Sequence, residues 1–330
     1  MTTSYLTLAD YANDARPLVA GVAKLLRENS RFMDILPFAN VGALNVKVVR
    51  EGGMPSLSWR EIGAAHSSAK ATKPDEIQER VYSIGNIIGV DKMYMRDTSP
   101  RLYNPMTYQT SMTVKSIARH FSDAAINGLP TDETKPVGLW YRVNNDLAST
   151  QKINGNGVDI SSDGASLSTA INTFFDLLDE TLYTVTDSFE DAGNVYLLCN
   201  DTMIQRYQSI ARQSGLLSVT TDAIGRTFNS YKGAKFVDMG RKYDDSTRII
   251  GNAETDAGTA LTGGDATSIY AVRVGPEYLT GWQEYGLEVS APQLDQTNQV
   301  LYYSVIDWAV GLALSHPRHS LAQLHGIVAA

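Results

Sequence analysis

The chain of 330 residues has a single cysteine, little charge and no long apolar run. One cysteine excludes an internal disulfide and every zinc or iron–sulfur site that needs several thiolates. No stretch approaches the roughly 18 apolar residues of a membrane-spanning helix, and the start lacks the basic and apolar regions of a secretory signal, so we expect no membrane partner. Charged residues make up 19% of the chain, against a usual share of about 25%. This shortage is typical of a surface that other protein covers.

The charge that is present is mainly negative. The net charge is −8, from 28 basic and 36 acidic residues, and the sequence pI is near 5.2. This balance argues against a protein whose overall field holds nucleic acid, although a local basic face stays open. The length predicts about two domains with real cores.

Two segments have the pattern of amphipathic helices. Thr7 and Asp10 resemble a capping box, and apolar residues then recur at helical spacing through residues 15–26. The clearer helix begins after Asn104, with Pro105 at its first position, and runs to residue 127 before the stop at Gly128. At 1.5 Å per residue it is about 34 Å long, so it can serve as a spine.

Alternation with a period of two begins at residue 44. It predicts a strand over 44–48, a second over 76–82, and a continuation over 84–95 with bends at Gly85 and Gly89. The connection over 51–75 is long for a compact domain. Fully extended, residues 44–60 reach roughly 40 to 55 Å, comparable with the diameter of the whole chain. We therefore expect this arm to lie in solvent or on a neighbour.

The remaining segments predict a mixed α and β region. Apolar residues are clustered over 32–38, and their spacing is too irregular for one face of a helix. We interpret this segment as an arm that packs on something else. The expected strands are residues 138–143, 195–198, 234–239, 269–274, 286–291 and 300–314, and the expected helices are residues 167–178 and a helix capped by Asn200 and ended by Gly215. Glycine, asparagine and serine predict a loop over 144–166, an acidic loop covers 241–267, and a short tail ends the chain.

No motif of catalysis is present. The sequence lacks the phosphate-binding, dinucleotide-binding, zinc-protease and nucleophile-elbow patterns. His316 and His319 are three residues apart, but Pro317 between them disfavours a helix, and His325 is the only other nearby zinc ligand, so we expect no zinc site there. We expect Cys199, at the end of an apolar strand, to be buried and inert. The acidic loop could offer oxygen ligands to calcium, but its spacing does not match the twelve-residue calcium loop. Its carboxylates are Asp238, Asp244, Asp245, Glu254, Asp256 and Asp265.

The hairpin is the strongest candidate for a functional site. Charges of both signs alternate along it, and Leu57 and Trp59 lie near its tip. One interpretation is a solvated hairpin with ion pairs worth about 0 to 1 kcal/mol each. The other is a clamp between subunits, in which an aromatic anchor enters a pocket and the charges fix the register. The predicted interface residues are Arg50, Leu57, Trp59, Arg60, Glu61, Glu79 and Arg80.

The order of these elements resembles the major capsid protein of tailed double-stranded DNA bacteriophages. The resemblance rests on the arm helix, on the loop tipped by the sequence LSWRE (57–61), on the spine helix, and on the closing sequence DWAVGLALSHPR (307–318). It implies the α+β Hong Kong 97-type capsid fold. Its parts would be an N-arm (1–43), an extended loop (44–83), a peripheral domain (84–136 and 286–330, with the spine helix at about 105–127), and an axial domain (137–285).

The resemblance also implies a function and partners. The chain would assemble with itself into hexamers and pentamers of an icosahedral head, which encloses packaged DNA with only loose contact. It would need no catalytic residue, cofactor or metal, and it would be found in the virion after assembly in the host cytoplasm. A portal protein and a decoration protein are further implied partners. Since the chain begins almost at once with its arm helix, we expect a separate scaffolding protein.

Some relatives crosslink their subunits by a bond between lysine and asparagine. Lys70, Lys73 and Asn298 could be considered for such a bond, but no motif fixes the pair.

Three other functions stay open at this point. An encapsulin-like nanocompartment would share the fold but package enzymes. A metal-dependent hydrolase would use the acidic loop together with His316, His319 and His325. A tail or baseplate component would form rings or tubes in place of closed shells.

Overall fold

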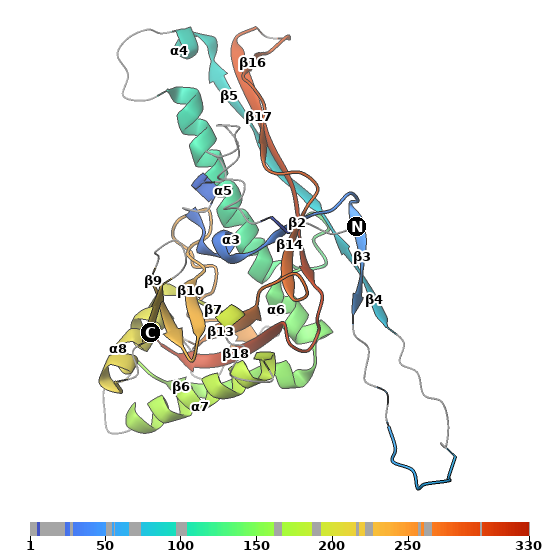
Figure 1. Cartoon of the computed structure of the whole chain (residues 1–330). Coiled ribbons are helices and arrows are strands. Elements are labelled where there is room, and N and C mark those ends of the chain that lie inside the picture. The colour runs from blue at the N-terminus through green and yellow to red at the C-terminus, as the bar shows by residue number, and fades with distance from the viewer. Residues whose placement is uncertain are drawn as a thin grey trace.

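The chain combines two large sheets with one long helix between them. The computed structural model describes residues 5–6, 24–26, 29–50, 55, 57–65, 74–96, 104–161, 167–186, 193–215, 218–221, 227–256, 259–260, 266–297 and 299–329. Both sheets have seven strands, and the expected α+β class is confirmed. Figure 1 shows a body, a ladder of long strands that rises from it, and a hairpin that leaves it in another direction.

The first sheet is built around one long strand. β17 (Leu301–Leu314) pairs with β5 (Tyr82–Asp91) along its first ten residues and with β14 (Leu279–Gln283) at its end. The other strands are β1 (Tyr5–Leu6), β2 (Phe38–Asn40), β15 (Glu288–Val289) and β16 (Gln293–Leu294). The β5–β17 register is unbroken from residue 82 to residue 91, so the bends that we predicted at Gly85 and Gly89 are wrong. A Cβ at Gly85 would lie 2.3 Å from the Ile306 carbonyl oxygen, which explains the glycine there by close packing.

The spine helix is α5 (Pro105–Asn127), as its caps predict. The Asn104 side chain accepts hydrogen bonds from the backbone N–H groups of Met106, at 3.0 Å, and Thr107, at 3.4 Å. These bonds satisfy donors that the first helical turn leaves free. The short helix α4 (Lys92–Arg96) lies between β5 and α5 in the chain.

An aromatic cluster joins α5 to the first sheet. The Phe121 ring on α5 lies 5.5 Å from the Trp308 ring on β17, and the Phe38 ring on β2 lies 5.6 Å from the same indole. Phe32 lies on α3 (Arg31–Ile35), and its ring stacks on the Phe121 ring with 6.3 Å between the ring centres. All four side chains are buried. The apolar segment that we predicted to pack on something else therefore packs in the chain's own core, because these rings bury one another.

The second sheet lies between two cores. Its strand order is β6 (Lys152–Asp159), β18 (Leu321–Val328), β13 (Ala266–Arg273), β7 (Val195–Cys199), β10 (Ala234–Asp238), β9 (Thr227–Tyr231) and β8 (Ser218–Thr221). Successive strand residues point to opposite faces. Leu197 thus packs with α7 (Leu167–Thr186) and α8 (Asp201–Gln213), whereas Leu198 packs in the core that contains the α5 side chains. Burial on both faces explains why the central strand β7 is a continuous apolar run.

The smaller elements complete the chain. They are the hairpin β3 (Asn45–Arg50) with β4 (Asp75–Arg80), the pair β11 (Thr255–Asp256) with β12 (Thr259–Ala260), the helix α6 (Leu139–Tyr141), the π-helical turn Arg142–Asp146 and the 3₁₀ turn Ser149–Gln151. The strand that we predicted over 138–143 is wrong. The side-chain amides of Asn144 and Asn145 donate to the carbonyls four residues earlier, at 2.7 and 3.0 Å, which favours helical turns.

Two strands near the end of the chain belong to different sheets. β14 belongs to the first sheet, and β18 belongs to the second sheet, so the short tail that we predicted there is wrong. The chain crosses between the sheets through residues 274–278 and 315–320. In β18 the side-chain Nε2 of Gln323 donates to the Ser268 and Tyr270 hydroxyls, each at 3.2 Å, which gives this polar group partners inside a buried strand. We also missed β6, which lies inside the predicted loop 144–166.

The predicted N-terminal helix is only partly tested. Residues 24–26 are helical, and the proposed cap residues Thr7 and Asp10 lie outside the described residues.

The aromatic cluster predicts a large effect of one truncation. We expect Phe121→Ala to lower the free energy of unfolding by about 3–5 kcal/mol, since it leaves a cavity against Trp308 and Phe38. Gln109→Ala on an exposed position of the same helix is the control, with an effect within about 0.5 kcal/mol. Denaturant midpoints of the two variants test this, and equal midpoints would contradict the assigned core.

Candidate functional site

The hairpin β3–β4 is the most unusual feature of the described surface. Its strands pair in register from Asn45 opposite Arg80 to Arg50 opposite Asp75. The backbone N–H of Val81 donates to the Leu44 carbonyl at 2.8 Å and closes its foot. The strands that we predicted here are confirmed, with β3 ending at Arg50 and β4 ending at Arg80. Figure 1 shows the hairpin leaving the body and pointing away from α5 and the second sheet.

The tip of the hairpin carries solvent-exposed apolar side chains. Leu57, Trp59 and Ile62 are 91%, 104% and 105% exposed. A tight turn shapes the tip, where the Ala64 N–H donates to the Glu61 carbonyl at 3.1 Å. Gly63 has φ +91°, a conformation that favours glycine. Burying one such large side chain stabilises a contact by about 1.5–3 kcal/mol, so this tip is suited to a partner surface.

The tip charges lie beside these side chains. Arg60 donates through Nη1 to the Ala64 carbonyl at 2.8 Å, which holds its stem along the turn. Arg60 and Glu61 are both exposed. The predicted residues Leu57, Trp59, Arg60 and Glu61 therefore lie on one exposed segment, which leads into the turn.

The foot of the hairpin contains a buried ion cluster. The Arg142 guanidinium binds Glu79 through both carboxylate oxygens, at 2.5 and 2.8 Å, and Arg50 Nη2 lies 3.7 Å from the same carboxylate. Arg50 Nε donates to the Leu314 carbonyl at 2.9 Å, and Arg142 Nη2 donates to the Leu312 carbonyl at 3.2 Å. The cluster thus ties both hairpin strands to the end of β17.

Burial and charge act on both guanidiniums. Burial lowers the pKa of Arg50, and the neighbouring Arg142 adds to this effect. Burial also works to lower the pKa of Arg142, but the contact with Glu79 outweighs it and leaves this pKa raised. Burial raises the pKa of the nearby Asp146, against the pull of Arg142. Two buried cations therefore depend on the Glu79 carboxylate.

The structure divides the predicted interface residues into two groups. Arg50 and Glu79 are 3% and 7% exposed and contact their own chain, so their side chains are not available to a neighbour. Arg80 is exposed, and its guanidinium lies 5.8 Å from the Tyr82 ring centre. Sequence reasoning missed Arg142, although an arginine that follows the apolar residues 137–141 is a signal for a buried charged partner.

The acidic loop does not form a metal site in the part of the chain that is described. Within the described ranges, no three histidine, cysteine, aspartate or glutamate residues group closely enough to hold a metal ion. Asp244 accepts hydrogen bonds from Ser246 and Thr247, which lower its pKa, and Asp245 pairs with Arg119 at 2.9 Å. The side chain of Asp256 and the whole of Asp265 lie outside the description.

The three histidines and the cysteine have structural surroundings in the chain. His316 Nδ1 accepts from the His319 N–H at 3.2 Å, and the two rings lie 5.2 Å apart. His325 lies on β18, buried in the second sheet. Cys199 is buried, as predicted, and burial raises the pKa of its thiol. Lys70, Lys73 and Asn298, considered for a crosslink, lie outside the described residues.

Solved structures share this architecture. A Mycobacterium phage Bobi structure aligns with a TM-score of 0.60, at 12% identity over 91% of this chain and 90% of that one. The SrpI encapsulin of Synechococcus elongatus aligns with a TM-score of 0.58, at 16% identity over 91% and 88%. The capsid of a native GTA particle gives 0.57, at 14% identity over 90% of each chain.

The chain has the Hong Kong 97-type capsid fold. The resemblance inferred from the order of elements is thus confirmed at the level of the fold. No family model matches the sequence, and no curated protein matches it. Among the described residues, no helix is both long and apolar enough to span a membrane.

The ion cluster predicts unequal effects of two similar substitutions. We expect Glu79→Ala to lower the free energy of unfolding by about 3–5 kcal/mol, because it leaves Arg50 and Arg142 buried without their carboxylate. Glu76→Ala is the matched control. It breaks the exposed Lys47–Glu76 pair at 3.2 Å, at a cost of about 0–1 kcal/mol. Urea denaturation of both variants checks this, and similar midpoints would refute a structural role for the cluster.

Glu254 predicts a pH effect on stability. Burial raises the pKa of Glu254 from 4.5 to about 7, although Ser268 donates a hydrogen bond to it. Between these values the folded chain binds more protons than the unfolded chain. The contribution of this group is therefore complete below pH 4.5 and is lost as the pH rises through about 7.

We expect Glu254→Gln to unfold at higher urea than the wild type at about pH 8, by the equivalent of about 1–3 kcal/mol, and to differ little at about pH 4.5. Glu180→Gln, on an exposed position of α7, should leave the wild-type pH profile unchanged. A Glu254→Gln profile that still parallels the wild type would show that this carboxyl does not titrate with folding.

Proposed function

We propose that the chain is a shell-forming protein, and specifically the major capsid protein of a tailed bacteriophage. It would self-assemble into the hexamers and pentamers of an icosahedral head that encloses double-stranded DNA. The observation that carries this proposal is the extended hairpin with its apolar tip, on a chain with the capsid fold. A monomer gains nothing from holding Leu57, Trp59 and Ile62 in water, whereas a neighbouring subunit can bury them.

The hairpin would act as a clamp between subunits. Leu57, Trp59, Arg60, Glu61 and Arg80 remain the proposed contact residues, because they are the predicted ones that the chain leaves exposed. The buried ion cluster supports this role, since a hairpin foot that is already ordered in the single chain loses less freedom on binding than a loose one. A scaffolding protein, a portal protein and a decoration protein are the proposed partners besides the chain itself.

The acidic net charge of −8 is compatible with loose contact to DNA. A container needs closure more than affinity for its contents, so no basic inner surface is required.

An encapsulin-like shell that packages proteins is the second candidate. The similarity to the SrpI encapsulin, over 91% of this chain, favours it as much as the phage structures favour a viral head. Both candidates predict shells, and the cargo separates them. Purified shells that contain nucleic acid support the viral head, and shells that contain an enzyme support the nanocompartment.

Assembly gives the direct test. We expect the full chain, alone or with a co-expressed scaffolding partner, to form hexamers or closed shells in light scattering and negative-stain images. The triple variant Leu57→Ser, Trp59→Ser, Ile62→Ser should stay folded, because these side chains bury nothing in the single chain, and should lose assembly. Tyr183→Ser, at an exposed aromatic on α7, is the control that should still assemble.

A stable species of one subunit under every condition would refute the shell function. Open tubes or rings in place of closed shells would point to a tail component.

A further inference from the structure

The chain contains three asparagine–glycine pairs, at residues 127–128, 154–155 and 156–157. In such a pair the backbone nitrogen of the glycine can attack the side-chain carbonyl carbon of the asparagine, because glycine has no side chain to hinder the approach. The attack requires a free carboxamide and a peptide plane that can turn. The three pairs consist of the same two residues, so their surroundings in the structure decide how they differ.

The first pair ends helix α5 and is held by its surroundings. The side-chain Nδ2 of Asn127 donates to Asp123 Oδ1 at 2.8 Å and to the Ile249 carbonyl at 3.0 Å. The Gly128 N–H donates to the Ala124 carbonyl at 2.9 Å. Both the carboxamide and the attacking nitrogen are therefore engaged.

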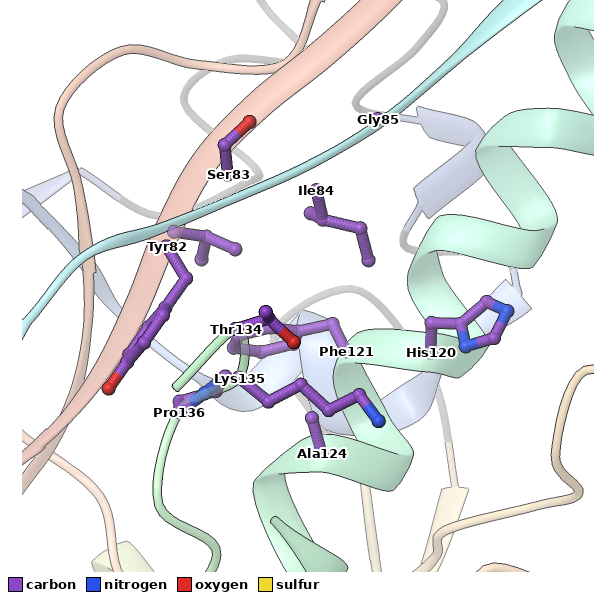
Figure 2. Close-up of a pocket in the computed structure, with 11 residues that line it drawn as sticks. Tyr82, Ser83, Ile84, Gly85, His120, Phe121, Ala124, Thr134, Lys135 and Pro136 are labelled. Atoms are coloured by element: carbon purple, nitrogen blue, oxygen red, sulfur yellow. The ribbon is translucent and has the colours of Figure 1, made fainter. Parts of the chain in front are cut away.

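The space around Gly128 is also closed. A Cβ at this position would collide with the Pro136 carbonyl oxygen, in the loop that follows α5. Figure 2 shows Ala124 of α5 and Pro136 of this loop beside the same pocket, and Gly128 lies between these two residues in the chain. The Gly138 N–H donates to the Gly128 carbonyl at 2.9 Å, which fixes this glycine further.

The second pair is restrained within β6. Asn154 lies opposite His325 of β18, and its side-chain Oδ1 accepts from the Asn156 N–H at 2.9 Å. Gly155 is buried, and a Cβ there would collide with the Ile327 side chain. The peptide between residues 154 and 155 thus packs against β18 and has no room to turn.

The third pair forms a bulge in β6. This strand pairs with β18 up to Asn154 and again from Val158, so residues 155–157 lie opposite the single residue Gly326. Asn156 is exposed, and none of the described residues bonds to its carboxamide. In the described part of the sheet β6 is an edge strand with β18 as its only neighbour. Among the three pairs, this one has the freedom that the attack requires.

The backbone of this bulge is already close to the reactive form. Asn156 and Gly157 have φ +49° and +71°, the positive values of a type I′ turn. If the peptide plane between them turns over, the pair becomes a type II′ turn, with ψ of Asn156 at about −120°. The Asn156 Cβ and the Gly157 nitrogen are then eclipsed about the Cα–C bond, which brings this nitrogen to the side-chain Cγ. Glycine accepts the change in the sign of φ that the rotation requires.

We infer that Asn156 is a modification site, which converts spontaneously to aspartate and isoaspartate. Hydroxide removes the proton of the Gly157 N–H, and the nitrogen forms a bond to Cγ of Asn156. The side-chain nitrogen takes a proton from water and leaves as ammonia, which restores the hydroxide. Water then opens the five-membered ring at Cγ, which gives aspartate, or at the backbone carbonyl carbon, which gives isoaspartate. One water is consumed and one ammonia is released, with no oxidation or reduction.

The product changes the edge of the second sheet. Each conversion adds one negative charge to the net charge of −8. Isoaspartate also lengthens the backbone of β6 by one carbon atom. The bulge already departs from ladder pairing, so it can take up the longer backbone while Asn154 and Val158 keep their partners. The conversion does not depend on the proposed shell function.

Mass spectrometry of the aged chain tests this inference. We expect folded protein in mildly alkaline buffer to deamidate at Asn156 at least about ten-fold faster than at Asn127 or Asn154, because those pairs must first break hydrogen bonds. The rate should rise with pH, since hydroxide removes the amide proton. Fragmentation of tryptic peptides locates each site, and transfer of a labelled methyl group by an isoaspartyl methyltransferase reports the isoaspartate.

Denatured protein provides the first control. In urea the three pairs should react at rates within about three-fold of one another, since the unfolded chain no longer restrains them. Asn156→Gln should lose most of the methyl labelling that the folded protein shows. Asn172→Gln, at an exposed position on α7, is the matched control and should keep it.

Three results would overturn the inference. Folded protein that deamidates no faster at Asn156 than at Asn127 would show that the bulge does not promote the reaction. The same preference for Asn156 in urea would assign it to the sequence and not to the bulge. Full methyl labelling of Asn156→Gln would place the isoaspartate elsewhere. None of these measurements needs an assembled particle, so their outcome is independent of the test of the shell function.

Discussion

The buried cluster of Arg50, Glu79 and Arg142 is the interaction on which the form of this molecule depends. It joins the hairpin to β17 at the point where β17 leaves the first sheet for the second. A buried ion cluster stabilises a fold little compared with apolar residues of similar size, but it tolerates only one geometry. Together with the Val81 N–H bond to the Leu44 carbonyl, this cluster fixes the direction in which β3 and β4 leave the body.

The same region connects the two sheets. Helix α5 packs its Phe121 face on the first sheet, and its core continues to Leu198 and Val237 on one face of the second sheet. Residues 315–320 cross between the sheets and are held by the Gln151 amide, which donates to the Pro317 and Leu321 carbonyls at 2.9 and 2.7 Å. The foot of the hairpin, helix α5 and the crossing segment 315–320 thus pack together, and the hairpin extends from the edge of this unit.

Local signals in the sequence predicted the elements that local physics determines. The Asn104 cap and Gly128 located α5 to the residue, and alternation located β3 and β4. The errors lie where distant residues decide the structure. The Gln323 amide nitrogen finds acceptors in a buried strand because Ser268 and Tyr270 lie beside it, and Arg50 and Glu79 are buried because Arg142, far along the chain, completes their cluster. No periodicity shows such partners, so the burial of Arg50 and Glu79 at the foot could not be predicted from the sequence.

In the proposed assembly, the foot and the tip have complementary tasks. A heterologous contact repeats the same rotation at each step, so whether a ring closes, and with how many copies, depends on a small angle. A tip that gains about 1.5–3 kcal/mol for each buried side chain can hold a ring together only because many copies act at once. The angle must then come from something stiffer than the tip contact. The bidentate Arg142–Glu79 pair, buried and bound to β17, holds the described foot of the hairpin in one arrangement, so in the proposed assembly ring size would depend in part on a cluster that is buried in its own chain.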